Sequence, residues 1–108
     1  MIGYKVFDEG FTCMHGNREN ITMEIGKTYT LNGKPKIASN GYHFCLNLLD
    51  CFNYYPIDMR TRIAKIDAIG DIDVDGNRCC TTKIKLLKEI SWEEIEQEIL
   101  KENMIEGM

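Results

Sequence analysis

The feature that most constrains this chain is a strand pattern that runs directly into a helix start near the C-terminal end. Between Thr81 and Ile90 polar and apolar residues alternate, which predicts a β-strand with one buried face. Ser91 follows, and Glu94 stands three residues later, which is the pattern of a capping box at a helix N-terminus. We therefore expect a terminal helix over residues 91–106 that docks on the sheet through one face, formed by Trp92, Ile95 and Ile99.

A second strand pattern provides a partner for the first. Residues 63–69 place Ala64, Ile66 and Ala68 on one face of an extended segment. The tripeptide Asp75-Gly76-Asn77 lies between the two patterns, and its residues tolerate the positive φ angles of a tight turn. The sequence thus predicts an antiparallel hairpin of 63–69 with 81–90, joined at this turn.

Shorter patterns complete an α+β fold. The expected segments are a strand over 4–7, a loop over 8–20, a hairpin of strands 27–31 and 35–38 with its turn at Asn32-Gly33, a strand over 42–45, and a helix over 48–55 capped by Asn47. Together they predict an antiparallel sheet of about five or six strands, with a short buried helix and a C-terminal helix packed on it. Residues 1–108 are expected to form one domain, with the sheet and short helix in 1–90.

The charge of the chain argues against direct nucleic-acid binding. The net charge is −4 and the pI is near 5.1, whereas proteins that neutralise phosphates need a basic face. Several of the acidic residues follow Trp92, and these are Glu93, Glu94, Glu96, Glu98 and Glu102. They predict either a solvated helix face or a negative surface for a basic partner.

The cysteines and the N-terminal segment indicate the compartment. Five cysteines, an odd number without a CxxC pair, do not form the pattern of a disulfide framework. The first ten residues lack the basic start and apolar run of a signal peptide, and no apolar run is long enough to span a membrane. We expect a cytoplasmic protein with reduced thiols, no membrane association and no cofactor.

Two groups of potential metal ligands fall short of a metal site. Residues 71–76 resemble the first half of a calcium-binding loop, but Thr82 stands where a bidentate glutamate is needed, so an acidic β-turn is the better interpretation. Zinc ligands are available in His43, Cys45, Cys51, Cys79 and Cys80. Their spacing lacks the usual pairs, so no metal is expected. A cysteine nucleophile activated by His15 or His43 likewise has no supporting motif.

Five sequence blocks occur in an order that resembles a known family. They are GYKVF at 3–7, IGKTY at 25–29, GYHFC at 41–45, FNYYP at 52–56 and IGDI at 69–72. The chain resembles, over about residues 3–92, an uncharacterised family of small domains of bacteria, phages and prophages, catalogued as a domain of unknown function. This resemblance implies a small protein of a mobile element acting inside a bacterium, and it supplies no catalytic residues.

Three functional hypotheses follow. The first is a non-enzymatic module that binds a host protein, such as a defence nuclease of the CRISPR type, through Asn53, Tyr54, Glu94 and Glu98. The second is an NAD-binding enzyme, because the GYHF strand and the following tyrosines resemble the nicotinamide-binding part of ADP-ribosyltransferases; its candidate residues are His43, Tyr54 and Glu89. The third is a structural protein that forms homodimers or larger assemblies through Trp92, Ile95 and Ile99.

Overall fold

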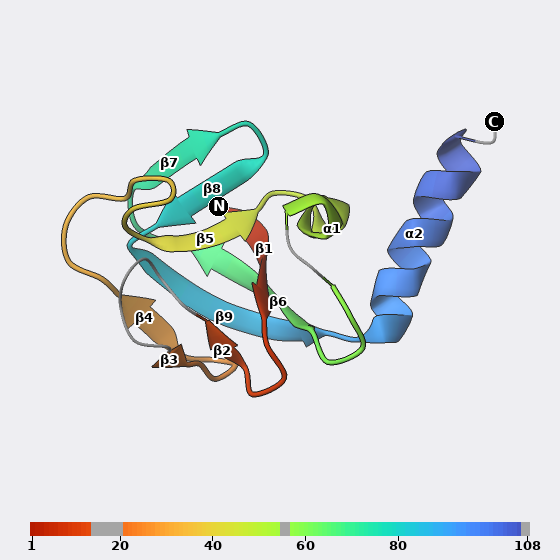
Figure 1. Ribbon diagram of the computed structural model, residues 1–108, viewed down its shortest axis with the longest axis horizontal. Coiled ribbons are helices and arrows are strands. Elements are labelled where there is room, and N and C mark those ends of the chain that lie inside the picture. The colour runs from red at the N-terminus through yellow and green to blue at the C-terminus, as the bar shows by residue number, and fades with distance from the viewer. Residues whose placement is uncertain (14–20, 55–56, 107–108) are drawn as a thin grey trace.

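The computed structural model describes the backbone of residues 1–13, 21–54 and 57–106, and the side chains of the same residues except 54 and 102–106 (Figure 1). Its main feature is a seven-stranded antiparallel sheet in the order β4-β9-β6-β1-β5-β8-β7. The α+β class is therefore confirmed, but the expected five or six strands were too few.

The elements follow one another closely along the chain. The strands of the large sheet are β1 (Ile2–Phe7), β4 (Thr28–Thr30), β5 (Tyr42–Cys45), β6 (Arg62–Ala68), β7 (Ile72–Asp75), β8 (Arg78–Thr81) and β9 (Lys83–Ile90). A small second sheet pairs β2 (Thr12–Cys13) with β3 (Ile21–Thr22), so the segment expected as a loop over 8–20 contains a short strand. The helical elements are the 3-10 turn η1 (Leu48–Asp50), α1 (Cys51–Tyr54) and α2 (Trp92–Glu106).

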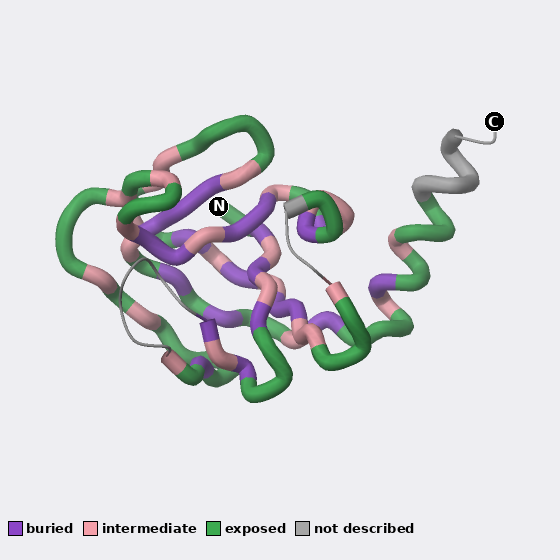
Figure 2. Tube along the Cα trace, viewed as in Figure 1, coloured by how far each residue is buried: buried purple, intermediate pink, exposed green. Residues whose placement is uncertain are grey.

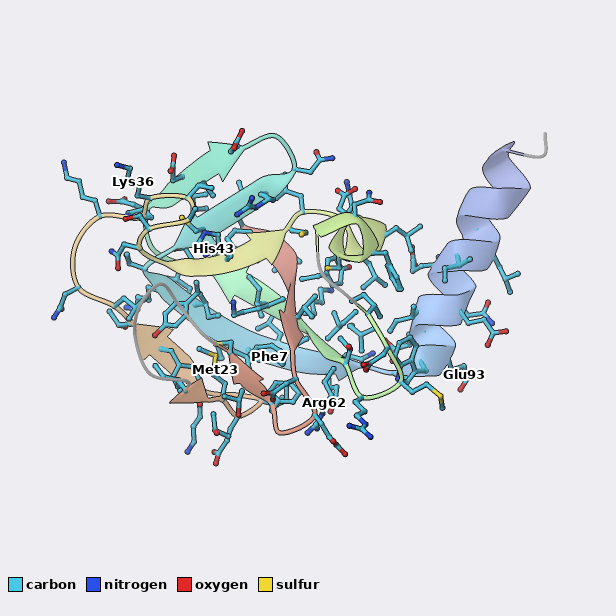
Figure 3. All side chains as sticks on the ribbon, viewed as in Figure 1. Phe7, Met23, Lys36, His43, Arg62 and Glu93 are labelled. Carbon is cyan, nitrogen blue, oxygen red and sulfur yellow. The ribbon has the colours of Figure 1, made fainter. Side chains whose placement is uncertain are left out.

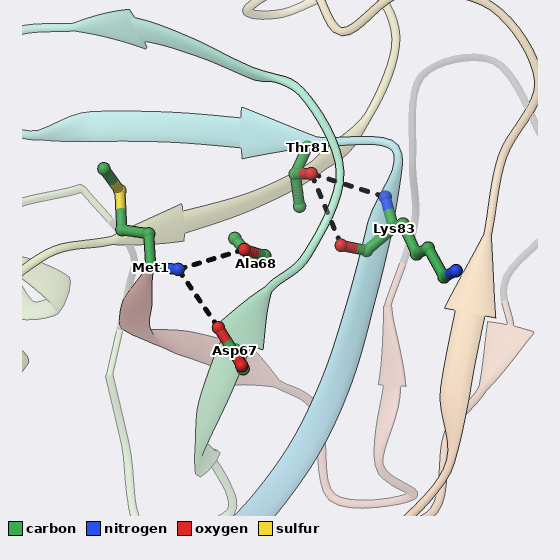
Figure 4. Close-up of polar contacts among 5 residues, drawn as sticks. All are labelled: Met1, Asp67, Ala68, Thr81 and Lys83. Atoms are coloured by element: carbon green, nitrogen blue, oxygen red, sulfur yellow. Dashed lines mark hydrogen bonds and ion pairs between the residues drawn. The ribbon is translucent and has the colours of Figure 1, made fainter.

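The expected hairpin of 63–69 with 81–90 is correct in its pairing and wrong in its turn. β6 and β9 pair in antiparallel fashion, but the turn at Gly76 joins β7 to β8 instead. The chain changes neighbours between Thr81 and Lys83, where the Thr81 hydroxyl accepts a hydrogen bond from the Lys83 N–H at 3.3 Å (Figure 4). No glycine, proline, asparagine or aspartate lies at this bend, so the sequence gives no turn signal for the break.

The expected hairpin at Asn32-Gly33 is wrong. β4 pairs with β9, and residues 35–38 contribute only a bridge between Lys36 and Asn40. The side-chain amide of Asn40 donates hydrogen bonds to the backbone carbonyls of Asn32 and Lys34. The loop therefore closes on itself and does not extend into a strand. The positive φ of Gly33 suits this loop as well as it would suit a hairpin.

The short helix has a different start from the expected one. Residues 48–50 form a 3-10 turn that leads into α1, and Asn47 makes no side-chain capping bond. Its amide donates instead to the carboxylate of Asp50 at 3.2 Å. The expected end of this helix at residue 55 lies outside the described residues.

Buried residues are concentrated in the strands of the sheet (Figure 2), and apolar side chains are buried on both of its faces. One face carries the larger cluster, with Phe7, Tyr42, Phe44 and Leu86 among its members. The opposite face carries a smaller cluster around Leu48, Ile63, Ile90 and Ile95, which joins η1 and the start of α2 to the sheet. The two clusters account for the alternation that the strand patterns show.

Helix α2 begins as expected and then leaves the sheet (Figure 1). The Ser91 hydroxyl accepts a hydrogen bond from the Glu94 N–H at 3.1 Å, which confirms the helix cap. Of the expected docking face only Ile95 is buried, whereas Trp92 and Ile99 remain 46% and 40% exposed. The expectation of a helix packed along the sheet is thus correct only for its first turn. No helix in the described part of the chain is long and apolar enough to cross a bilayer.

Candidate functional site

A cavity of about 780 Å³ lies where β1 and β5 separate. The two strands pair at a single position, Tyr4 with Cys45, and then diverge. Beyond that point β1 supplies Lys5 and Phe7 to the wall, and β5 supplies His43 (Figure 3). The cavity therefore exists because two neighbouring strands of the sheet do not remain paired along their length.

Lys5 is the unusual residue of this cavity. Its side chain is only 5% exposed, and its ammonium donates a hydrogen bond to the carbonyl of His43 at 2.8 Å. The Nζ atom also lies 5.8 Å from the ring centroid of Phe7. No Asp or Glu of the described residues lies within ion-pair distance of this group. Burial lowers the pKa of Lys5, because a dry surrounding disfavours the charged amine.

His43 is held by the backbone on both sides of its ring. Its Nε2 accepts a hydrogen bond from the Ala38 N–H at 2.8 Å, and a second hydrogen bond joins the ring to the backbone of Gly41. Burial lowers the pKa of His43, and the nearby charges of Lys5 and Arg78 lower it further. The imidazole is therefore neutral at pH 7, and it fixes the loop that precedes β5.

The structure does not bring the candidate enzyme residues together. β1 and β6 lie between the strand of His43 and the strand of Glu89, which at about 4.8 Å per strand places their backbones about 14 Å apart. The Glu89 carboxylate is bound by the guanidinium of Arg62 at 2.7 and 2.8 Å, and this bond lowers its pKa. Tyr54 lies in α1, and its side chain is outside the described residues.

The five cysteine side chains are all buried. Packing as small apolar side chains is therefore enough to explain their presence. A hydrogen bond from Cys51 lowers the pKa of Cys45, and the same bond together with burial raises the pKa of Cys51. Within the described ranges no three His, Cys, Asp or Glu side chains converge as metal ligands. His15, the other candidate base for a thiol, lies outside the described residues.

The acidic residues before Gly76 serve the local structure. The turn lies between β7 and β8, as an acidic β-turn should, and Gly76 has a positive φ of 63°. One carboxylate oxygen of Asp73 accepts a hydrogen bond from the Ile37 N–H at 2.9 Å. This contact holds the loop that His43 also holds from β5, two strands away.

The candidate partner-binding residues lie on the helices. Asn53 is exposed on α1, and Glu94 and Glu98 lie on α2, where they pair with Lys88 at 3.0 Å and Lys101 at 3.5 Å. Glu98 and Lys101 also line a groove of about 350 Å³ between α2 and η1.

Sequence reasoning missed Lys5 as a site residue. The signal was present, since Lys5 stands between Gly3 and Phe7 in the inward phase of β1, where a charged residue is out of place. The cavity itself could not be foreseen, because it depends on how far β1 and β5 stay paired.

Comparisons with known proteins give one result. Neither the curated proteins nor the solved structures contain a significant match to this sequence. A family model described as a domain of unknown function, DUF7666, matches residues 1–98. The match covers the sheet, both short helical elements and the first half of α2. The chain therefore belongs to the DUF7666 family, whose function is not defined.

Proposed function

We propose that this protein is a non-enzymatic protein-binding module and that α2 carries its binding surface. The observation that supports this proposal is the exposure of Trp92, Ile99 and Leu100, which each keep between 40% and 47% of their surface open to solvent. Successive residues of an α-helix are separated by about 100°, so these three lie within a sector of about 100°. A projecting helix with a grouped apolar face is suited to insertion into a groove of another protein.

The charges on α2 define the partner more closely. Glu93 and Glu96 are exposed and fall on the same side of the helix as the apolar face. A partner groove with basic residues at its rim would complement them, whereas a second copy of the same helix would bring like charges together. We therefore favour a partner of a different kind over self-association.

A nuclease fits this description. Enzymes that bind nucleic acid carry basic surfaces for the phosphates, and an acidic helix can compete for such a surface. The resemblance to phage and prophage domains adds a bacterial cytoplasm as the setting and a host protein as the target. We accordingly propose a defence-system nuclease, such as a CRISPR effector, as the candidate partner and inhibition as the outcome of binding.

The test compares three forms of the protein against purified CRISPR effectors. They are the wild type, the triple variant Trp92→Ala/Ile99→Ala/Leu100→Ala, and Leu87→Ala, which removes an exposed apolar residue outside α2. We expect the wild type and Leu87→Ala to bind and to inhibit DNA cleavage, and the triple variant to bind at least about tenfold more weakly. Binding should also weaken as salt is raised.

Two results would count against the proposal. If the triple variant bound and inhibited as well as the wild type, α2 would not be the binding surface. If light scattering showed that the wild type is a stable dimer and the triple variant a monomer, the exposed face would serve self-association. A heterologous partner would then not be needed to explain it.

A further inference from the structure

We infer that the cavity between β1 and β5 binds a small organic anion whose carboxylate or phosphate group pairs with Lys5. The cavity has a volume of about 780 Å³, within the usual range for sites that enclose small molecules. It lies in the sheet, and its described lining contains no residue of α2. This site is therefore separate from the proposed protein-binding surface.

Lys5 shares the cavity wall with Arg60 and Arg78, and its own ammonium group is incompletely bonded. A lysine ammonium has three N–H donors, and among the described residues Lys5 has one hydrogen-bond acceptor, the neutral carbonyl of His43. Such a buried charge is costly unless an opposite charge accompanies it. An anionic group in the cavity would provide that charge together with further acceptors.

Three carboxylates, those of Asp8, Glu9 and Asp58, belong to the cavity wall, and none of them forms an ion pair with Lys5. One oxygen of Asp8 accepts hydrogen bonds from the N–H groups of Gly10 and Thr12 at 3.0 and 2.9 Å. One oxygen of Asp58 accepts hydrogen bonds from the N–H groups of Arg60 and Thr61 at 2.7 and 3.1 Å. Both side chains thus organise their own turns, and neither forms an ion pair with Lys5 in this structure.

The other walls indicate the rest of the ligand. Phe7 belongs to the wall; it is only 2% exposed and its ring stacks on Phe11 with centroids 4.4 Å apart, so it forms a fixed apolar edge of the cavity. Val6 and Cys13 add further apolar lining. We therefore assign the site to molecules that combine one anionic group with an apolar body, and we use aromatic compounds as probes of this class.

The experiment measures binding of four probes to the full chain by calorimetry, with NMR of the Lys5 amine as a second readout. Phenyl phosphate and benzoate carry the proposed combination, benzyl alcohol lacks the charge, and inorganic phosphate lacks the apolar body. We expect phenyl phosphate or benzoate to bind at least about tenfold more tightly than the other two, and to shift the Lys5 15Nζ signal. The comparison of phenyl phosphate with benzoate decides between a phosphate and a carboxylate ligand.

Variants locate the site. Lys5→Met should weaken binding of the preferred probe at least about tenfold. Lys65→Met is the matched control, because Lys65 lies on the neighbouring strand β6, opposite Tyr4, and outside the described lining. The α2 triple variant should bind the probe as the wild type does, so this inference and the proposed function can fail separately.

Three results would overturn the inference. They are the absence of binding by both charged aromatic probes, equal binding of benzyl alcohol or inorganic phosphate, and unchanged affinity in Lys5→Met. A far-UV circular dichroism spectrum equal to that of the wild type shows that Lys5→Met is folded, which keeps the last result decisive.

Discussion

The β1–β5 cavity and helix α2 break the usual distribution of residues in opposite ways. The cavity buries a charged side chain, Lys5, without an anionic partner among the described residues, and α2 exposes three large apolar side chains. Both arrangements cost stability in an isolated molecule, since a buried charge loses its hydration and an exposed apolar surface gains nothing from the fold. Such departures from local rules tend to coincide with function, which is why we place a ligand at one and a partner at the other.

The largest change in stability should come from the part of α2 that is packed in the core, and the exposed part should contribute little. Ile95→Ala removes a side chain that is 3% exposed, and we expect it to lower the free energy of unfolding by about 2–4 kcal/mol. Ile99→Ala, one turn later on the same helix, should change it by less than about 0.5 kcal/mol. Urea denaturation of both variants measures the difference, and equal losses would mean that α2 is packed along its whole length.

A somewhat smaller effect should appear outside the cavity, where β1 lies close to β5. A side chain at Gly3 would meet the ring of Phe44 at 2.4 Å and the carbonyl of Cys45 at 2.8 Å. Gly3→Ala should therefore lower the free energy of unfolding by about 1–3 kcal/mol. Gly10→Ala is the control, because its new methyl group would have only ordinary contacts at 3.5 Å or more. Thermal melting measures both variants. An equal loss of stability would show that the close approach of β1 to β5 at Gly3 is not the cause.

At the cavity wall the expected change has the opposite sign. Lys5→Met keeps an unbranched side chain of similar length and removes the buried charge, so we expect it to raise the free energy of unfolding by about 1–2 kcal/mol. Lys65→Met, on the neighbouring strand, should leave it within about 0.5 kcal/mol of the wild type. A marked loss of stability in Lys5→Met would show that the amine is needed for its hydrogen bond to His43.

The smallest predicted effect is a dependence on pH. The pKa of His43 is lowered from its usual 6.5, chiefly by burial and then by Lys5 and Arg78, so the unfolded chain binds a proton that the folded chain does not. Stability contributed by this residue should therefore be complete above pH 6.5 and decrease as the pH falls below it.

The size of this effect is bounded, because a single proton changes stability by at most about 1.4 kcal/mol per pH unit. Urea denaturation of the wild type and His43→Gln at several pH values isolates the contribution of this group. Parallel pH profiles of the two proteins would contradict the assignment.

The sequence predicted those parts of the molecule that depend on neighbouring residues. Alternation identified β5 and the pairing of β6 with β9, and the Ser91 cap identified the start of α2. The order of strands could not be foreseen, because the chain changes neighbours between Thr81 and Lys83 without a turn residue to mark the change. For the same reason β4 was assigned a local partner when its actual partner, β9, lies more than fifty residues away.

The candidate sites were less accessible to sequence reasoning. Whether His43 and Glu89 lie close together depends on the order of strands, which the sequence does not reveal. The sheet places two strands between them. The acidic residues of α2 were identified, but the exposure of Ile99 was not, since an amphipathic pattern does not reveal how far a helix remains on its sheet. Lys5 alone was open to prediction from its phase in β1.

The most direct measurement of the central claim, that Lys5 is kept for a ligand at a cost in stability, is a cycle of four urea denaturation curves. Wild type and Lys5→Met are each unfolded with and without saturating phenyl phosphate or benzoate, whichever binds more tightly. The account predicts that Lys5→Met is the more stable protein without the probe and gains little from it, whereas the wild type gains at least about 1.4 kcal/mol. A wild type that is already the more stable protein and gains no more than Lys5→Met would contradict the account.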